Sequence, residues 1–334
     1  MEVKQLGAYN SESGKILELD IMKFYGILLV VLGHVAMTYT PMSLIVPEES
    51  SIFMNDIKHI IYTFHMPMFV FISGCVFAYQ LEIKKKNTTF VRLFCNKAKR
   101  LLIPFYVFGF LWVWPNMILL GFRNPVHYAI DGFILAIDPR HLWYVMMLFC
   151  SFLLFWGLRQ LCLKCHIPTY TISLLAIGLY ILPLNFSYFQ IGSTKEYFLW
   201  FSFGYFFMTH RTVAKYVSTL SILVLSVHYV FPVIIPTIAA KLSWAIVGIS
   251  LFYFLSIKLQ GIVNTHLYKW ITPNSFGIYL FHAMIIYILE FAFHAYSLNP
   301  IILSLLIFIV SVILSILLTI GVRRCGIAII MGEK

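Results

Sequence analysis

The chain has 334 residues, of which 61% are hydrophobic and 11% charged, with 24 Lys and Arg against 13 Asp and Glu. A soluble domain usually carries about 25% charged residues, so this composition and a mean hydropathy of +0.88 exclude an ordinary soluble fold. The apolar runs are continuous and too long for the alternating strands of about 10 residues that build a membrane β-barrel. The sequence therefore predicts an all-α, polytopic membrane protein.

Ten apolar stretches follow one another along the chain and predict ten membrane-spanning helices, each of which typically needs about 20 residues. They cover residues 21–39, 60–78, 101–120, 142–158, 170–184, 197–208, 217–233, 244–257, 276–293 and 301–322. The sixth is the shortest, and Pro232 and Pro236 mark the boundary between the seventh and the eighth. We expect one membrane domain at 21–322, preceded by a cytoplasmic segment at 1–20 and followed by a cytoplasmic tail at 323–334.

The basic residues follow the alternation of loops that ten spans would produce. Eighteen Lys and Arg side chains fall in the two terminal segments and in every second loop, whereas the opposite loops hold five. Positively charged residues concentrate on the cytoplasmic side of membrane proteins. We therefore expect both termini in the cytoplasm. The net charge of +11 then records orientation in the membrane, and no nucleic-acid partner is expected.

Few ionisable side chains lie inside the predicted spans, and such residues usually face an interior site because exposing them to lipid is costly. Lys23 and His34 are 11 residues apart in the first span, which places them on one helix face about 16 Å apart. Asp20 precedes Lys23 by three residues and can pair with it. His65 and Glu290 lie at a depth similar to that of His34. The sequence predicts a His-rich outer chamber, although a single histidine of this kind can equally be a packed core residue.

A group of cations precedes the third span, on the same predicted side of the membrane as Lys23. Lys97, Lys99 and Arg100 lie within four residues of one another, so we expect a cationic inner mouth. The spacing of Cys162, Cys165 and His166 fits c-type haem attachment, but it falls in a predicted cytoplasmic loop. No second Cys pair or nearby His pair completes a metal site, and we expect no metal.

Several short motifs occur in order along nearly the whole chain. The first runs from Leu19 to His34 and contains Leu-Asp, a basic residue three positions after the Asp, and a His eleven positions further on. The later ones are Phe-His-Met-Pro-Met-Phe at 64–69 with Ser-Gly at 73–74, Arg-Leu-Leu-Ile-Pro at 100–104, His-Leu-Trp-Tyr at 141–144 and Ser-Phe-Gly-Ile-Tyr-Leu-Phe-His at 275–282. Together they resemble the acyltransferase-three family of integral-membrane O-acyltransferases. Lys23 and Lys97 stand where many members of that family have Arg.

This resemblance implies transfer of an acyl group, usually acetyl, from cytosolic acetyl-CoA to a hydroxyl of a carbohydrate, either cell-surface or lipid-linked. It also implies a multi-pass protein of the cell membrane, in contact with membrane lipids. His34 would act as a general base or accept the acyl group itself, with His65 and Glu290 as its partners. The expected cofactor-binding residues, for the CoA phosphates, are Lys23, Lys97, Lys99 and Arg100. The expected substrate contacts are His141, Trp143, Ser275, Tyr279 and His282.

Two other functions fit the composition. A transporter of a sugar or of a lipid-linked intermediate would also have ten spans with buried charges, but transporters often contain internal repeats, and none stands out here. A membrane sensor or scaffold would keep the fold without the chemistry. The presence of both Lys23 and His34 favours the enzyme.

Overall fold

The computed structural model describes residues 9–10, 15–40, 43, 45, 50–86, 88–121, 125–184, 186–230, 237–294, 296 and 298–333. Within these residues the only strands are β1 (Tyr9–Asn10) and β2 (Lys15–Ile16), which form a short antiparallel pair. The rest of the regular structure is helical, so the all-α prediction is confirmed. Most of the predicted N-terminal segment, residues 1–8 and 11–14, lies outside the described residues.

The helices alternate along the chain with short 3-10 and π-helical turns. The α-helices are α1 (Leu17–Met37), α2 (Ile52–Ala78), α3 (Phe90–Lys97), α4 (Ile103–Phe108), α5 (Trp114–Leu119), α6 (Pro125–Ala129), α7 (Trp143–Lys164), α8 (Thr171–Ile181), α9 (Ile191–Thr209), α10 (Arg211–Val230), α11 (Thr237–Lys258), α12 (His266–Phe293) and α13 (Pro300–Arg324). The π-helical turns are η2 (Tyr79–Ile83), η3 (Ala98–Leu102), η4 (Gly109–Val113) and η5 (Ile130–Ile134). The 3-10 turns are η6 (Arg140–Leu142), η7 (Tyr188–Gln190), η8 (Gln260–Asn264) and η9 (Ala328–Met331).

Seven helical segments in the described part of the chain are long and apolar enough to cross a membrane. They are Leu17–Met37, Ile52–Ile83, Phe90–Leu119, Arg140–Lys164, Thr237–Lys258, His266–Phe293 and Pro300–Arg324. Thr171–Ile181 and Tyr216–Val230 are shorter apolar helices. The multi-pass architecture is confirmed, whereas the count of ten spans stays a prediction. The end of the seventh predicted span, residues 231–233, lies outside the described residues.

Several helices begin earlier than their apolar stretches do, because a polar cap rather than the first apolar residue starts the helix. The second span was expected from residue 60, but α2 begins at Ile52, where the Ser51 side chain accepts a hydrogen bond from the Met54 N–H. The third was expected from residue 101, but helix begins at Phe90, capped in the same way by Thr89. Capping side chains satisfy backbone donors that a helix start leaves without a partner.

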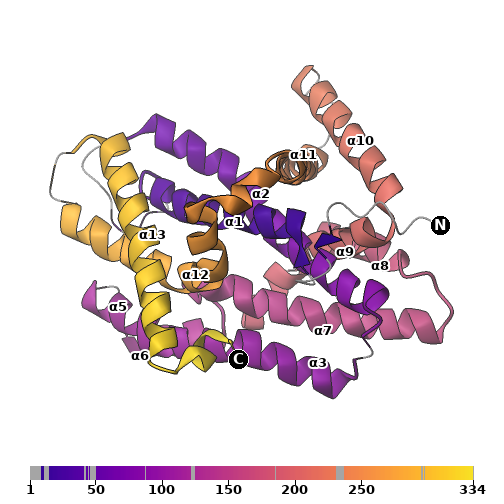
Figure 1. The fold of residues 1–334 in the computed structure, drawn as a ribbon, viewed down its shortest axis with the longest axis horizontal. Coiled ribbons are helices and arrows are strands. Elements are labelled where there is room, and N and C mark those ends of the chain that lie inside the picture. Colours follow the sequence, from indigo (N-terminus) through magenta and orange to yellow (C-terminus); the bar gives the residue numbers. More distant parts are fainter. Residues whose placement is uncertain are drawn as a thin grey trace.

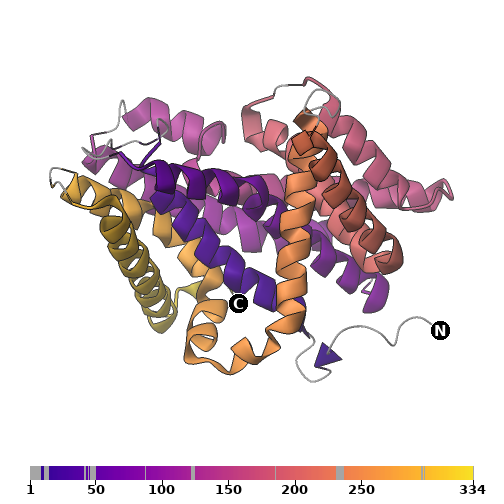
Figure 2. The same ribbon diagram turned by 90° about the horizontal axis from the view of Figure 1, so that it is seen from above.

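Helix α1 lies at the centre of the molecule. It contacts α2, α11, α12 and α13, and Figure 1 shows it between α12 and α13 on one side and α8 and α9 on the other. Figure 2 shows α10 beside α11, on the side of α11 away from α13. Lys23 and His34 therefore belong to a helix that is packed against several others.

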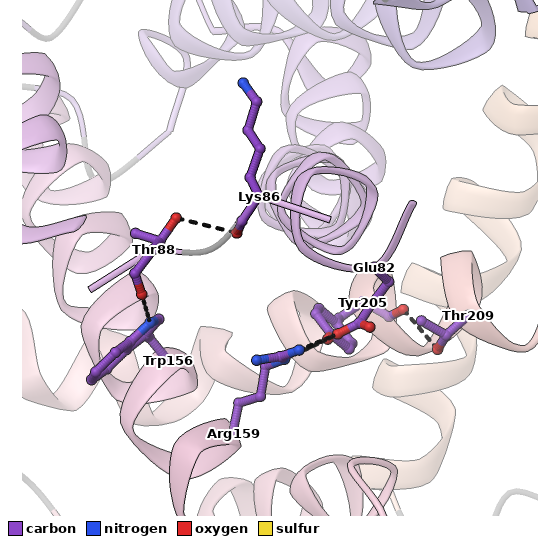
Figure 3. Close-up of polar contacts among 7 residues, drawn as sticks. All are labelled: Glu82, Lys86, Thr88, Trp156, Arg159, Tyr205 and Thr209. Atoms are coloured by element: carbon purple, nitrogen blue, oxygen red, sulfur yellow. Dashed lines mark hydrogen bonds and ion pairs between the residues drawn. The ribbon is translucent and has the colours of Figure 1, made fainter. Parts of the chain in front are cut away.

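A polar cluster ties together the ends of α2, α7 and α9 (Figure 3). The Glu82 carboxylate, in η2, accepts hydrogen bonds from Arg159 Nη2 at 2.7 Å, from Arg159 Nε at 3.0 Å and from the Tyr205 hydroxyl. The Thr209 hydroxyl donates in turn to the Tyr205 carbonyl, at 3.2 Å. A nearby bond, from Trp156 Nε1 to the Thr88 carbonyl at 3.1 Å, joins α7 to the chain that follows η2. These contacts fix α2 and α7 relative to each other.

Candidate active site

A cavity of about 260 Å³ lies between α1, α2, η3, α7 and α12. Its lining residues recur every three or four positions, because each helix turns one face towards it. They are Lys23, Ile27 and Val30 on α1; Met66, Phe69, Ile72, Ser73 and Val76 on α2 with Gln80 in η2; Lys97 and, in η3, Arg100 and Leu101; Tyr144, Leu148 and Phe152 on α7; and Ser275, Phe276 and Tyr279 on α12. Five separate chain segments thus build one chamber.

One end of the cavity is cationic, with Lys23, Lys97 and Arg100 in its lining. Lys23 pairs with Asp20 on the same helix. Lys97 Nζ lies 3.2 Å from the centroid of the Phe152 ring. Neither Lys97 nor Arg100 has a carboxylate within ion-pair distance among the described residues. Two cations without anionic partners next to an apolar chamber favour an anionic ligand there.

The π-helical turn η3 begins directly after Lys97 and carries Arg100. Such turns are rare and occur frequently at functional sites, where the wider turn changes the direction of side chains. Lys99, also in η3, is exposed and is not among the residues that line the cavity. The sequence suggested four cations as ligands of the acyl donor. Three of them, Lys23, Lys97 and Arg100, line the same cavity.

Aromatic hydroxyl side chains form the other end of the cavity. Tyr144 and Tyr279 both line it, with ring centroids 5.7 Å apart. Tyr279 is almost fully buried, and its hydroxyl donates to the carbonyl of His141. Ser275 lies one helical turn before Tyr279 and also lines the cavity. Trp143 instead packs against Tyr197, with ring centroids 5.0 Å apart, and is not among the lining residues.

A cluster of three histidine rings adjoins Tyr279. The rings of His34 and His282 meet edge to face with centroids 4.9 Å apart, and those of His141 and His282 do so at 5.5 Å. His34 follows Val30 by four residues, so it occupies the next position on the α1 face that lines the cavity. The three rings join segments that are far apart in the sequence, and we call them the His cluster.

Hydrogen bonds to backbone carbonyls orient two of these rings. His282 Nδ1 donates to the carbonyls of Ile278 and Tyr279, at 3.0 and 2.8 Å, so its Nε2 carries a lone pair. His141 Nε2 lies 3.1 Å from the Leu280 carbonyl. Within the described residues, His34 Nδ1, His141 Nδ1 and His282 Nε2 are buried and have no hydrogen-bond partner. Buried polar atoms in this state are costly and are typical of functional sites.

The two other residues that the sequence placed in the chamber have their own partners. His65 Nδ1 donates to the Ile61 carbonyl at 2.8 Å, and its ring packs on Tyr62 with centroids 4.7 Å apart. The Glu290 carboxylate lies further along α12 and accepts a hydrogen bond from the Thr38 hydroxyl. The structure thus gives the His34 ring a contact with His282, and His282 in turn contacts His141.

Several lining residues were not singled out in the sequence, among them Gln80, Leu148 and Phe152. The spacing of the α7 residues is visible in the sequence, because Tyr144, Leu148 and Phe152 follow one another at intervals of four residues, about one helical turn. The same spacing is produced by any stripe of packed core residues, so only the structure distinguishes the two cases. No group of three or more His, Cys, Asp or Glu side chains in the described part of the chain is placed to hold a metal ion.

The sequence model of a family described as an acyltransferase domain matches residues 16–320. The chain belongs to the acyltransferase-three family. Neither a curated protein nor a solved structure matches it. As a member of the acyltransferase-three family, the protein is an integral-membrane acyltransferase, and the matched segment contains every residue of the cavity and of the His cluster.

Proposed function

We propose that this acyltransferase transfers an acetyl group from cytosolic acetyl-CoA to a hydroxyl of a cell-surface or lipid-linked carbohydrate, in the cell membrane. The observation that carries the proposal is the uneven distribution of polar groups along the cavity. At one end Lys97 and Arg100 have no carboxylate partner among the described residues, and the His cluster lies beside the other end. A long donor with an anionic head and a reactive tip matches that arrangement. The acyltransferase domain is assigned to residues 21–322.

The donor would lie with its phosphates at Lys23, Lys97 and Arg100. Hydrogen bonds between ionised partners are about twice as strong as neutral ones, which suits phosphate oxygens. The narrow pantetheine arm would pass Ile27, Val30 and Leu148, whose side chains are apolar. Lys23 and His34 are 11 positions apart on one helix. The distance along the axis is therefore about 16 Å, which is comparable to the length of that arm. The excess of basic residues in alternate loops assigns the cationic end to the cytoplasm.

In the proposed reaction, His34 acts as general base on the acceptor hydroxyl. His282 is held by its two carbonyl partners so that Nε2 presents a lone pair, which is suited to accept the N–H of His34. The other nitrogen of His34 then takes the hydroxyl proton, and the oxygen attacks the thioester carbonyl. The carbon–sulfur bond breaks, and the protonated His34 returns the proton to the leaving thiolate. Transient acylation of His34 is the alternative route, with the same residue as nucleophile.

The test of this function is transfer of label from radiolabelled acetyl-CoA to candidate glycans by the purified protein. We expect the wild-type protein to transfer label, and the Arg100→Ala variant to show a KM for acetyl-CoA raised about tenfold with little change in kcat. A charge-assisted contact typically contributes about 1.5–3 kcal/mol, and each 1.4 kcal/mol is a factor of about ten. A loss of uniform binding raises KM rather than lowering kcat.

The matched control is Arg92→Ala, which removes an exposed cation of α3 outside the cavity. We expect its KM for acetyl-CoA to equal that of the wild type. An unchanged KM in Arg100→Ala would place the nucleotide elsewhere, and no transfer by the wild type to any carbohydrate would contradict the proposed acceptor class.

A further inference from the structure

The end of the chain forms a compact structure against the rest of the protein. After α13 the chain turns at Gly326 and forms η9, and the residues from 328 to 333, which we call the C-terminal hook, pack back onto α4. Met331 is fully buried in the hydrophobic core. The hook lies within the predicted C-terminal tail, and it packs against the membrane domain.

Gly332 brings the hook against the backbone of Arg100. Its φ is +68°, and a Cβ at this position would lie 2.5 Å from the Arg100 carbonyl oxygen and 2.8 Å from the Arg100 Cα. Glycine alone combines this left-handed conformation with so close an approach of two backbones. The contact is made at the residue whose side chain lines the cationic end of the cavity.

The next residue joins the hook to α13 and, through Arg323, to α12. The Glu333 carboxylate accepts hydrogen bonds from Nε and Nη2 of Arg323, both at 2.7 Å. Arg323 also donates to the Asn274 side-chain oxygen at 2.5 Å and to the Pro273 carbonyl at 2.8 Å. Ser275 and Phe276, which line the cavity, follow directly on α12. The hook therefore connects η3 with the part of α12 that directly precedes its cavity-lining residues.

We propose that the C-terminal hook positions Arg100 for the phosphates of the acyl donor, with Gly332 and Glu333 as positioning residues. This inference rests on the proposed function, because it assumes that an acyl-CoA occupies the cavity. The hook touches the backbone of Arg100 and leaves its exposed side chain available to the ligand. It acts on donor binding through Arg100 and takes no part in the chemical step.

The central experiment compares Gly332→Ala with Gly326→Ala. Both glycines have positive φ, +68° and +74°, so alanine introduces a similar backbone strain at each, but a Cβ at Gly326 has nothing within 4 Å. We expect Gly332→Ala to raise the KM for acetyl-CoA about tenfold at unchanged kcat, as loss of the Arg100 contact would. Gly326→Ala should keep the wild-type KM. An unchanged KM in Gly332→Ala, or an equal rise in both variants, would overturn the assignment.

A double-mutant cycle separates positioning from a general structural role. If the hook acts through Arg100, then Gly332→Ala adds nothing to the KM of Arg100→Ala, whereas independent effects would multiply and overturn the proposal. A raised KM in Arg100→Ala with a normal KM in Gly332→Ala would contradict the hook alone. A normal KM in Arg100→Ala would contradict the donor site itself, so the two failures are distinguishable.

A second variant covers the case in which Gly332→Ala does not fold. Glu333→Gln removes the ion pair with Arg323 and keeps the backbone of the hook. Partly exposed ion pairs contribute little, so we expect the KM for acetyl-CoA to rise only about threefold. A wild-type KM in this variant would contradict the role of Glu333. Thermal unfolding in detergent on the same preparations shows which variants are folded.

Discussion

Replacement of His34 by Gln is expected to abolish acyl transfer while the protein still folds and binds acetyl-CoA. Glutamine keeps some hydrogen-bonding capacity but cannot take a proton at neutral pH, so only the chemical step loses its base. Loss of a general base typically lowers a rate by about 10²–10⁴-fold. The expectation depends on the place of His34, one turn beyond Val30 on the face that lines the cavity and in ring contact with His282.

The measurement is kcat with labelled acetyl-CoA, together with acetyl-CoA binding and thermal stability, all on one preparation. His59→Gln is the matched control, because His59 is an exposed residue of α2 away from the His cluster, and it should behave as the wild type does. If His34→Gln turned over at the wild-type rate, the catalytic role would be wrong. If it lost stability but kept its turnover, His34 would be a packing residue.

The second large effect is expected at the contact between α2 and α9. A Cβ at Gly204 would lie 2.1 Å from the Phe71 carbonyl oxygen, and a Cβ at Gly74 would lie 2.0 Å from the Phe201 carbonyl oxygen. The two helices thus approach each other backbone to backbone, as small residues allow in membranes. Gly204→Ala should force them apart and cost about 1–3 kcal/mol of folding free energy.

Gly157→Ala is the matched control, since Gly157 lies in helix α7 and a Cβ at that position would have nothing within 4 Å. There alanine removes the entropic penalty of glycine in a helix and should stabilise the protein by about 0.5–1 kcal/mol. Thermal unfolding in detergent should therefore give shifts of opposite sign for the two variants. An unchanged or raised unfolding temperature in Gly204→Ala would show that the α2–α9 contact does not constrain the fold.

The sequence predicted the helices well, because an apolar run of sufficient length has few alternatives to a membrane helix. It also placed Lys23 and His34 on one face of α1, since positions 11 residues apart within a single helix have a fixed relation. The sequence did not show which residues of other helices lie next to Lys23 and His34. His34 meets His282, 248 positions later, and helical spacing contains no information on which helices pack together.

The sequence was least informative at His65, Glu290 and the hook. Depth in the membrane suggested His65 and Glu290 as partners of His34, but residues at one depth can face different neighbours, as Glu290 faces Thr38. Gly332 could not be identified, because glycine at a chain end is ordinary until its contact with Arg100 is seen. The relation of two residues within one helix can be predicted from their spacing, whereas contacts between helices needed the structure.

An experimental structure of the wild-type protein with bound CoA tests the proposed donor site and its relation to His34 most directly. We predict that the CoA phosphates contact Lys23, Lys97 and Arg100, and that the arm follows the cavity past Val30 so that the sulfur ends beside Tyr279 and the His cluster. CoA bound outside this cavity, or bound in it with the sulfur directed away from His34, would contradict the proposed mechanism.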